Sequence, residues 1–132
     1  MWRSLVSRIV ALAVASTFLI AGAALAQGPW VAPAGEKAKK NPLPADKKVV
    51  EQGEKLAKVN CVSCHGAKGK GDGAAAAALN PKPADWTSKR VRDETDGEIF
   101  WKISNGRGAM PPWKHLPEND RWALIRYLRS LK

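Results

Sequence analysis

The sequence contains little cysteine and histidine, and it contains no segment with the pattern of a β-strand. Two cysteines and two histidines are the whole supply of thiol and imidazole groups among 132 residues. A structural zinc site usually takes four such ligands, so it would require all of them at once. No alternation of polar and apolar residues is long enough to predict a strand. These absences disfavour a zinc-stabilised fold and predict an all-α protein.

Acidic residues are also scarce relative to basic ones. The chain has 22 lysine and arginine residues against 12 aspartate and glutamate residues, which gives a formal net charge of +10. A basic protein is steered toward acidic docking faces or anionic membrane, and this steering raises the encounter rate more than the final affinity. We therefore expect partner proteins with acidic docking faces, and transient contact with a membrane surface is compatible with this charge.

Residues 1–26 have the three parts of a secretory signal peptide. Arg3 and Arg8 give the start a positive charge, an apolar run covers residues 9–26, and this run ends in the small-residue sequence A-L-A. We expect cleavage before Gln27 and a periplasmic location, which argues against nucleic acid as a target. The run of 18 residues is also just long enough to cross a bilayer, so an uncleaved membrane anchor remains an alternative.

Two further segments follow the predicted signal peptide. Residues 27–43 are rich in proline, alanine and lysine and have no apolar periodicity, which predicts a flexible leader. Trp30 is the exception in this segment, and we interpret it as an isolated aromatic residue rather than a docking anchor. Residues 44–132 are left for one small domain.

The most informative motif is the C-x-x-C-H sequence over residues 61–65, which is typical of covalent attachment of a c-type haem. Two thiols three residues apart on a helical turn can each add to a vinyl group of one porphyrin. The histidine that follows then reaches the iron from the same face, as the proximal ligand. We therefore predict one haem c, attached through Cys61 and Cys64 and ligated by His65.

Three other interpretations of this motif stay open. A redox dithiol would be expected within a strand-helix-strand pattern, which the surrounding sequence lacks. A zinc site would need Cys61, Cys64, His65 and His115 together, with the first two crowded on one turn. A disulfide is compatible with an exported protein, but it leaves the adjacent histidine unexplained.

Met110 is the only methionine outside the predicted signal peptide, and it is followed by Pro111 and Pro112. A thioether suits haem iron, and Met/His ligation raises the reduction potential. The two prolines stiffen the backbone because each fixes φ. We predict Met110 as the distal ligand, which would fill the sixth position and favour electron transfer over substrate binding. The alternatives are a flexible core residue and His115 as the second ligand.

Helical periodicity and capping signals surround these motifs. Apolar residues at helical spacing predict a first helix over residues 45–60 and a last helix over residues 118–131. Between them, Thr95 followed three residues later by Glu98 forms a capping box and opens another helix, which Gly106 closes.

Taken together, residues 46–131 resemble a class I c-type cytochrome, of the small mono-haem kind found in the bacterial periplasm. The motifs that carry the resemblance are a glycine in the first helix, the haem-attachment sequence, a Met-Pro loop and an aromatic-leucine pair in the last helix. In this chain they are Gly53, Cys61-Val62-Ser63-Cys64-His65, Met110-Pro111 and Tyr127-Leu128.

The resemblance implies a small cytochrome c fold, with three to five helices wrapped around one covalently bound haem. The first and last helices should cross, with Gly53 beneath Leu124 or Tyr127. A carbonyl of the proline loop, that of Pro81 or Pro83, should accept a hydrogen bond from the His65 ring. Four tryptophans are expected to line the haem pocket: Trp86, Trp101, Trp113 and Trp122.

The function implied is that of a periplasmic cytochrome c, which carries single electrons between a respiratory or dehydrogenase donor and a terminal acceptor. Such a carrier has no catalytic residue and is not an enzyme, and we expect a monomer that meets redox partner proteins transiently. One alternative is a dedicated cytochrome subunit of a periplasmic dehydrogenase or respiratory complex. Another is a haem gas sensor or enzyme in which the sixth position is open.

Overall fold

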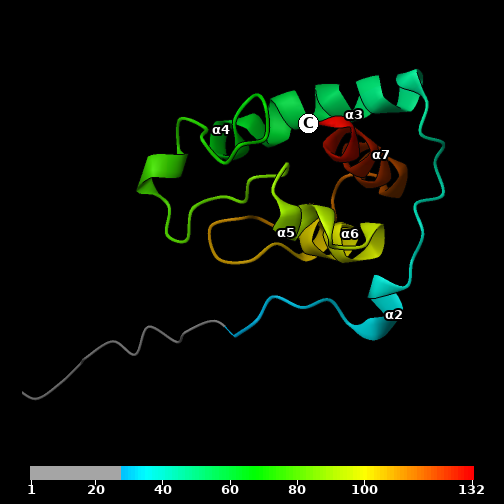
Figure 1. The fold of residues 1–132 in the computed structure, drawn as a ribbon, viewed down its shortest axis with the longest axis horizontal. Helices are drawn as coiled ribbons and strands as arrows, with labels where there is room; N and C mark the ends of the chain where they lie inside the picture. Colours follow the sequence, from blue (N-terminus) through cyan, green and yellow to red (C-terminus); the bar gives the residue numbers. More distant parts are fainter. Residues whose placement is uncertain (1–27) are drawn as a thin grey trace, which may run out of the picture.

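The computed structural model describes residues 28–132, so the predicted signal peptide over residues 1–26 lies outside the described residues. The described part is helical and has no strand, apart from an isolated bridge between Arg107 and Met110. This confirms the all-α prediction. In chain order the helices are α2 (Ala34–Lys37), α3 (Lys47–Asn60), α4 (Val62–His65), the 3-10 helix η1 (Ala76–Ala78), α5 (Lys89–Arg92), α6 (Asp96–Asn105) and α7 (Glu118–Ser130) (Figure 1). None of these helices could span a membrane.

The two longest helices, α3 and α7, lie against each other at a close crossing (Figure 1). Gly53 makes this approach possible, because a Cβ at this position would collide with the Ala123 carbonyl and lie 2.9 Å from the Cβ of Tyr127. The predicted crossing over Gly53 is therefore confirmed. Tyr127 is one of the two partners that the resemblance implied, and the Ala123 backbone takes the place of Leu124.

Side-chain caps account for where two of the helices begin. The Asp46 carboxylate accepts a hydrogen bond of 2.9 Å from the Val49 amide, so α3 begins one residue after this cap rather than at residue 45. At the start of α6, the Thr95 hydroxyl accepts from the Glu98 amide and the Glu98 carboxylate accepts from the Thr95 amide. The predicted capping box is confirmed.

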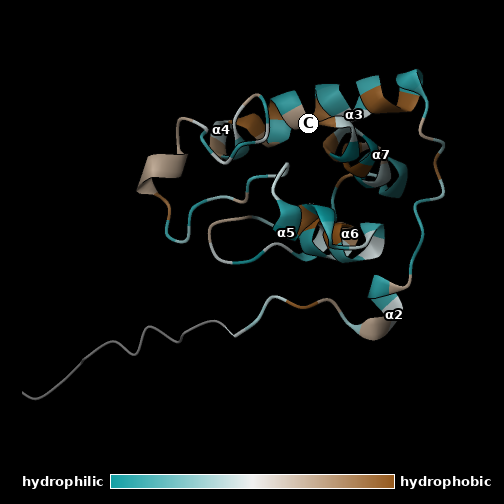
Figure 2. Cartoon of the chain, in the orientation of Figure 1, coloured by the Kyte–Doolittle hydropathy of each residue, from teal (hydrophilic) through white to brown (hydrophobic). Residues whose placement is uncertain are grey.

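The core consists of two groups of apolar side chains that share α7. Phe100 and Trp122 stack between α6 and α7 with ring centroids 3.9 Å apart, and Ile125 beside them is fully buried. On the opposite side of α7, Leu124 and Tyr127 pack with Ala57 of α3. Figure 2 shows hydrophobic and hydrophilic residues alternating around α3, as expected for a helix with one buried face.

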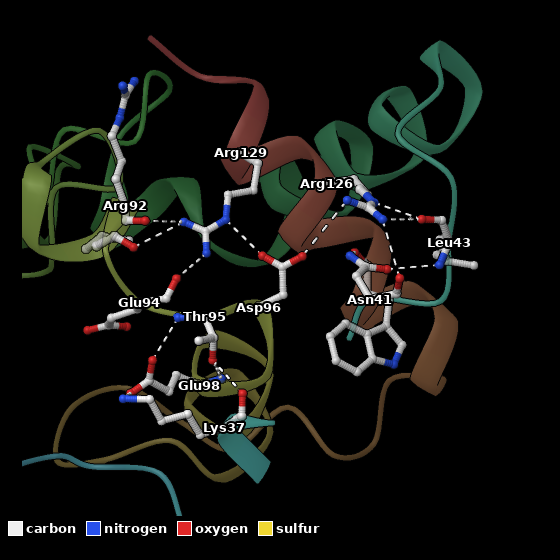
Figure 3. Close-up of polar contacts among 12 residues, drawn as sticks. Lys37, Asn41, Leu43, Arg92, Glu94, Thr95, Asp96, Glu98, Arg126 and Arg129 are labelled. Atoms are coloured by element: carbon white, nitrogen blue, oxygen red, sulfur yellow. Dashed lines mark hydrogen bonds and ion pairs between the residues drawn. The ribbon is translucent and has the colours of Figure 1, made fainter. Parts of the chain in front are cut away.

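Charged side chains join α6 to α7 at the edge of this core. The Asp96 carboxylate lies 2.9 Å from Nε of Arg129 and 3.9 Å from the guanidinium of Arg126 (Figure 3). Arg129 also donates to the backbone carbonyls of Val91 and Arg92, at the end of α5. One arginine therefore links α5, α6 and α7.

The described part of the leader, residues 28–43, differs from the flexible segment that its composition predicts. The Thr95 hydroxyl donates a 2.8 Å hydrogen bond to the carbonyl of Lys37, and Arg126 donates from Nε to the carbonyl of Leu43 at 2.9 Å (Figure 3). These contacts use backbone carbonyls of the leader. They therefore leave no hydropathy pattern in its sequence, which explains why composition alone predicted flexibility.

Candidate functional site

The predicted haem-attachment residues lie together on one turn that directly continues α3. The amides of Cys64 and His65 both donate to the carbonyl of Cys61, at 3.1 Å and 2.9 Å. Both thiols are free and half-buried. Burial raises the pKa of Cys61 to about 11, with the nearby Cys64 adding to the effect. A redox dithiol depends on a lowered thiol pKa, so this environment does not favour the dithiol interpretation.

The His65 ring is held by a backbone carbonyl through only one of its two nitrogens. Nδ1 lies 3.0 Å from the carbonyl oxygen of Ala84, and because a carbonyl can only accept, Nδ1 carries the proton. Nε2 is then left with its lone pair, the form of imidazole that ligates a metal. Burial lowers the pKa of His65, although the hydrogen bond to Ala84 opposes this, so the neutral ring is favoured.

The residue that accepts from His65 differs from the expected one. The resemblance implied Pro81 or Pro83, and the structure shows that the carbonyl belongs to the residue that follows Pro83. The Pro83 carbonyl lies against Gly71, so closely that a Cβ on this glycine would collide with it. Ala84 was missed because a backbone acceptor has no side-chain signal in the sequence.

Trp86 packs directly on His65. Its ring stacks on that of His65, with centroids 4.7 Å apart and 26° between the planes. The Trp86 amide donates to the carbonyl of Gly69 at 2.7 Å, and a Cβ on Gly69 would collide with the indole. The bare glycine backbone therefore lets the indole lie flat beside the imidazole, where it restricts rotation of the ring.

The other three tryptophans predicted to line the haem pocket lie in three different places. Trp122 is buried in the core against Phe100, so its assignment to the haem pocket is not supported. Trp113 follows the Met-Pro loop and lies tilted beside His115, with centroids 5.4 Å apart. Trp101 is half-buried on α6.

The glycine-rich loop after His65 folds back onto the attachment turn. The amide of Gly71 donates to the carbonyl of His65 at 2.8 Å, and the amide of Gly73 donates to that of Cys64 at 3.1 Å. A Cβ on Gly73 would collide with the Ser63 carbonyl. The loop is thus held against the backbone of the turn, so it fixes the position of the two thiols and the imidazole.

Met110 lies in a tight loop that is tied to the end of α6. Its amide and carbonyl are both hydrogen-bonded to the backbone of Arg107, at 3.0 Å and 2.8 Å. The Trp113 amide donates to the carbonyl of Ile103 at 3.0 Å, which closes the loop onto α6. Gly106 has a φ of 60°, a left-handed conformation that glycine adopts readily. Met110 is half-buried, whereas His115 is exposed.

The donor set of the attachment turn fits a c-type haem. It offers two free thiols one helical turn apart and an imidazole whose Nε2 is available as a ligand. Within residues 28–132, no group of three or more His, Cys, Asp or Glu side chains is arranged to hold a metal ion by itself. The zinc interpretation therefore finds no support in this part of the chain. In Figure 1, α4 and the loop between α6 and α7 are drawn on the same side of the molecule. The role of Met110 as distal ligand stays a prediction.

Comparison with known families agrees with this donor set. The family described as cytochrome C oxidase, cbb3-type, subunit III matches residues 48–128, which include the attachment turn and Met110. The chain belongs to this family. Its resemblance to a c-type cytochrome is confirmed, and this cytochrome domain is one that binds haem c.

Comparison with individual proteins gives a structural match and no curated match. No curated protein matches this cytochrome domain. Among solved structures it is similar to a chain of the Kuenenia stuttgartiensis reducing HAO-like protein complex, at 26% sequence identity and a TM-score of 0.60. The match covers 69% of this chain and 47% of that chain, so the domain spans about half the length of its neighbour.

Proposed function

We propose that this cytochrome domain is a carrier of single electrons. One haem c would be attached covalently through Cys61 and Cys64, with His65 as the proximal ligand and Met110 as the distal ligand. The observation that carries the proposal is the attachment turn itself. It holds both free thiols and an imidazole whose Nδ1 donates to Ala84, which leaves Nε2 to bind the iron.

A haem c bound here would supply a one-electron iron couple. The residues of the chain would hold its surroundings fixed. Ala84 and Trp86 restrict the His65 ring from two sides. The hydrogen bonds between Arg107 and Met110 hold the Met-Pro loop in one conformation. With both axial positions filled there is no open coordination site for a substrate, so we propose that the protein is not an enzyme.

The surface charge supports redox partners with acidic docking faces. Nine basic residues, several of them on α3 or near the attachment turn, are exposed: Lys47, Lys48, Lys55, Lys58, Lys68, Lys70, Lys89, Arg90 and Lys114. Cations of this kind speed the encounter with an acidic partner and are screened by salt. Together with the predicted signal peptide, they support a periplasmic carrier that docks transiently between a respiratory or dehydrogenase donor and a terminal acceptor.

A second candidate function has the same haem and the same electron transfer, but as a fixed subunit of a complex instead of a free carrier. The family is named for a subunit of an oxidase, and the structural neighbour is part of a protein complex. Both names favour a dedicated cytochrome subunit of a periplasmic dehydrogenase or respiratory complex. Purification from the native membrane and periplasmic fractions separates the two candidates. A complex subunit copurifies at a fixed ratio to its partners, whereas a free carrier runs as a monomer.

Covalent attachment is tested by maturing the chain in a host that assembles c-type cytochromes and then denaturing it. The proposal predicts that one haem stays bound to the unfolded polypeptide, as seen by intact mass. The double variant Cys61→Ser with Cys64→Ser should lose it completely. Val59→Ala, at a position of α3 that is 84% exposed, is the matched control and should keep it. Loss of the haem from the denatured wild-type protein would refute the proposal.

A further inference from the structure

In Figure 1 the first part of the described leader lies along α6, from the side of the loop between α6 and α7 to α2. Its central part is fixed at the start of α6. A Cβ on Gly97 would collide with the Glu36 carbonyl and lie 2.9 Å from that of Lys39, so the leader backbone rests directly on the helix. Lys37 adds an ion pair of 3.1 Å with Glu98 (Figure 3).

The beginning of the described leader reaches the end of α6 through Trp30. This ring is half-buried, with Nζ of Lys102 at 5.4 Å and Cζ of Arg107 at 6.0 Å from its centroid. Lys102 is itself held by Glu94, at 2.5 Å. The Arg107 guanidinium also donates to the carbonyl of Gly28. The indole therefore contacts one cation of α6 and one cation of the loop that follows this helix.

Arg107 is the residue that connects this contact to the candidate haem site. Its side chain is held by Gly28 and Trp30 of the leader, while its backbone makes both hydrogen bonds to Met110. Any rotation that pulls Met110 away must move the backbone of Arg107, and this would disturb its side-chain contacts. The leader and the methionine are thus coupled through one residue.

We propose that residues 28–32 brace the Met110 loop, with Trp30 and Arg107 as positioning residues for the distal ligand. The inference rests on the proposed role of Met110 at the iron. The nearly complete burial of Ala32, which is 4% exposed, fixes the leader backbone between its anchor on α6 and Trp30. A cation over an aromatic face at a surface site shifts an equilibrium by about two- to fivefold. Two such cations on one ring should therefore favour the conformation in which the backbone of Met110 is hydrogen-bonded to that of Arg107.

The experiment uses the full haem-loaded chain and compares wild type with Trp30→Ala, Trp30→Phe and Val31→Ala. Val31 is the matched control, because it is the neighbouring residue and is 64% exposed. Two quantities are measured: the hydrogen-exchange rate of the Met110 amide, and the affinity for added imidazole, which competes with the thioether at the sixth position. Neither readout depends on electron-transfer activity.

With Trp30→Ala, we expect the Met110 amide to exchange about fivefold to tenfold faster and imidazole to bind tighter by a similar factor. The amides in the middle of α7, such as that of Ile125, should keep their wild-type rates. Trp30→Phe retains an aromatic face, so its exchange rate and imidazole affinity should lie close to those of wild type. Val31→Ala should behave as wild type. Unchanged exchange and imidazole affinity in Trp30→Ala would overturn the proposal. Equal acceleration of the α7 amides would do so too, since it would show a general effect on stability.

The two proposals can fail separately. If the far-red iron–thioether absorption band is missing from wild type, then the role of Met110 as ligand fails. The exchange rate of the Met110 amide still reports on the brace in that case. If wild type shows the band and Trp30→Ala leaves both measured quantities unchanged, only the brace fails.

Discussion

Nδ1 of His65 lies 3.0 Å from the carbonyl oxygen of Ala84, and this contact determines which ring nitrogen is available to a metal. Because the carbonyl can only accept, it fixes the tautomer with the proton on Nδ1 and leaves Nε2 as the ligand atom. The Trp86 ring stacks on the same imidazole at 4.7 Å. The orientation of the His65 ring is therefore set by a backbone acceptor and an aromatic face together.

Replacing Trp86 should loosen this orientation and admit water to the proximal side. With Trp86→Ala, we expect the reduction potential of the haem-loaded protein to fall by on the order of 50 mV, because greater exposure favours the more charged oxidised state. Trp86→Phe keeps a ring over the imidazole and should lie close to wild type. Potentiometric titration of the three proteins measures the effect. Equal potentials for Trp86→Ala and wild type would show that the stack does not influence the site.

The α3–α7 crossing should be intolerant of even one methyl group at Gly53. A Cβ there collides with the backbone carbonyl of Ala123, which cannot rotate away as a side chain can. We expect Gly53→Ala to lower the free energy of unfolding of the haem-loaded protein by about 2–3 kcal/mol, as overpacking does. Gly35→Ala is the control, because no heavy atom lies within 4 Å of a Cβ at Gly35. Denaturant titration measures both, and equal midpoints for Gly53→Ala and wild type would contradict the crossing.

The capping box predicts that the stability of the fold depends on pH through one residue, Glu98. The Thr95 amide, with Lys37 beside it, holds the pKa of Glu98 below its ordinary value of 4.5. A depressed carboxylate pKa stabilises the fold at pH values above the unfolded pKa, and this contribution is lost as the pH falls through the lower folded value. Glu98→Gln should therefore lower stability by about 0.5–1 kcal/mol at neutral pH.

Glu98→Gln should also show less loss of stability than wild type as the solution is acidified below pH 4.5. Glu51→Gln is the matched control, since Glu51 forms only an exposed ion pair with Lys47 at 3.6 Å. Thermal unfolding measured at several pH values between neutrality and acid gives the comparison. If Glu98→Gln and wild type lose stability in parallel on acidification, Glu98 is not the residue that makes stability depend on pH.

The sequence predicted the parts of the fold that depend on local pattern. The apolar face of α3, the capping box of α6 and the glycine at the helix crossing are each visible as residue types at fixed spacings. The C-x-x-C-H motif likewise brings its three functional side chains onto one turn, because they are adjacent in the chain. These features require no knowledge of which distant segments meet.

The features that were missed depend on where backbone groups of distant segments lie. The carbonyl of Ala84 reaches the His65 ring although the two residues are 19 positions apart in the sequence. The leader binds α6 and α7 through its own carbonyls, which accept from Thr95 and Arg126. A carbonyl is present at every residue, so neither contact alters the composition or hydropathy that sequence analysis can use.

The central claim is that a covalent haem is ligated by His65 and Met110, and the optical spectrum of wild type beside Met110→Ala tests it most directly. For wild type we expect sharp reduced c-type bands together with the weak far-red iron–thioether band in the oxidised state. Met110→Ala should lose the far-red band, lower the reduction potential and bind carbon monoxide or cyanide. Identical spectra for the two proteins would contradict ligation by Met110, and the absence of haem bands from wild type would contradict the account of the site as a whole.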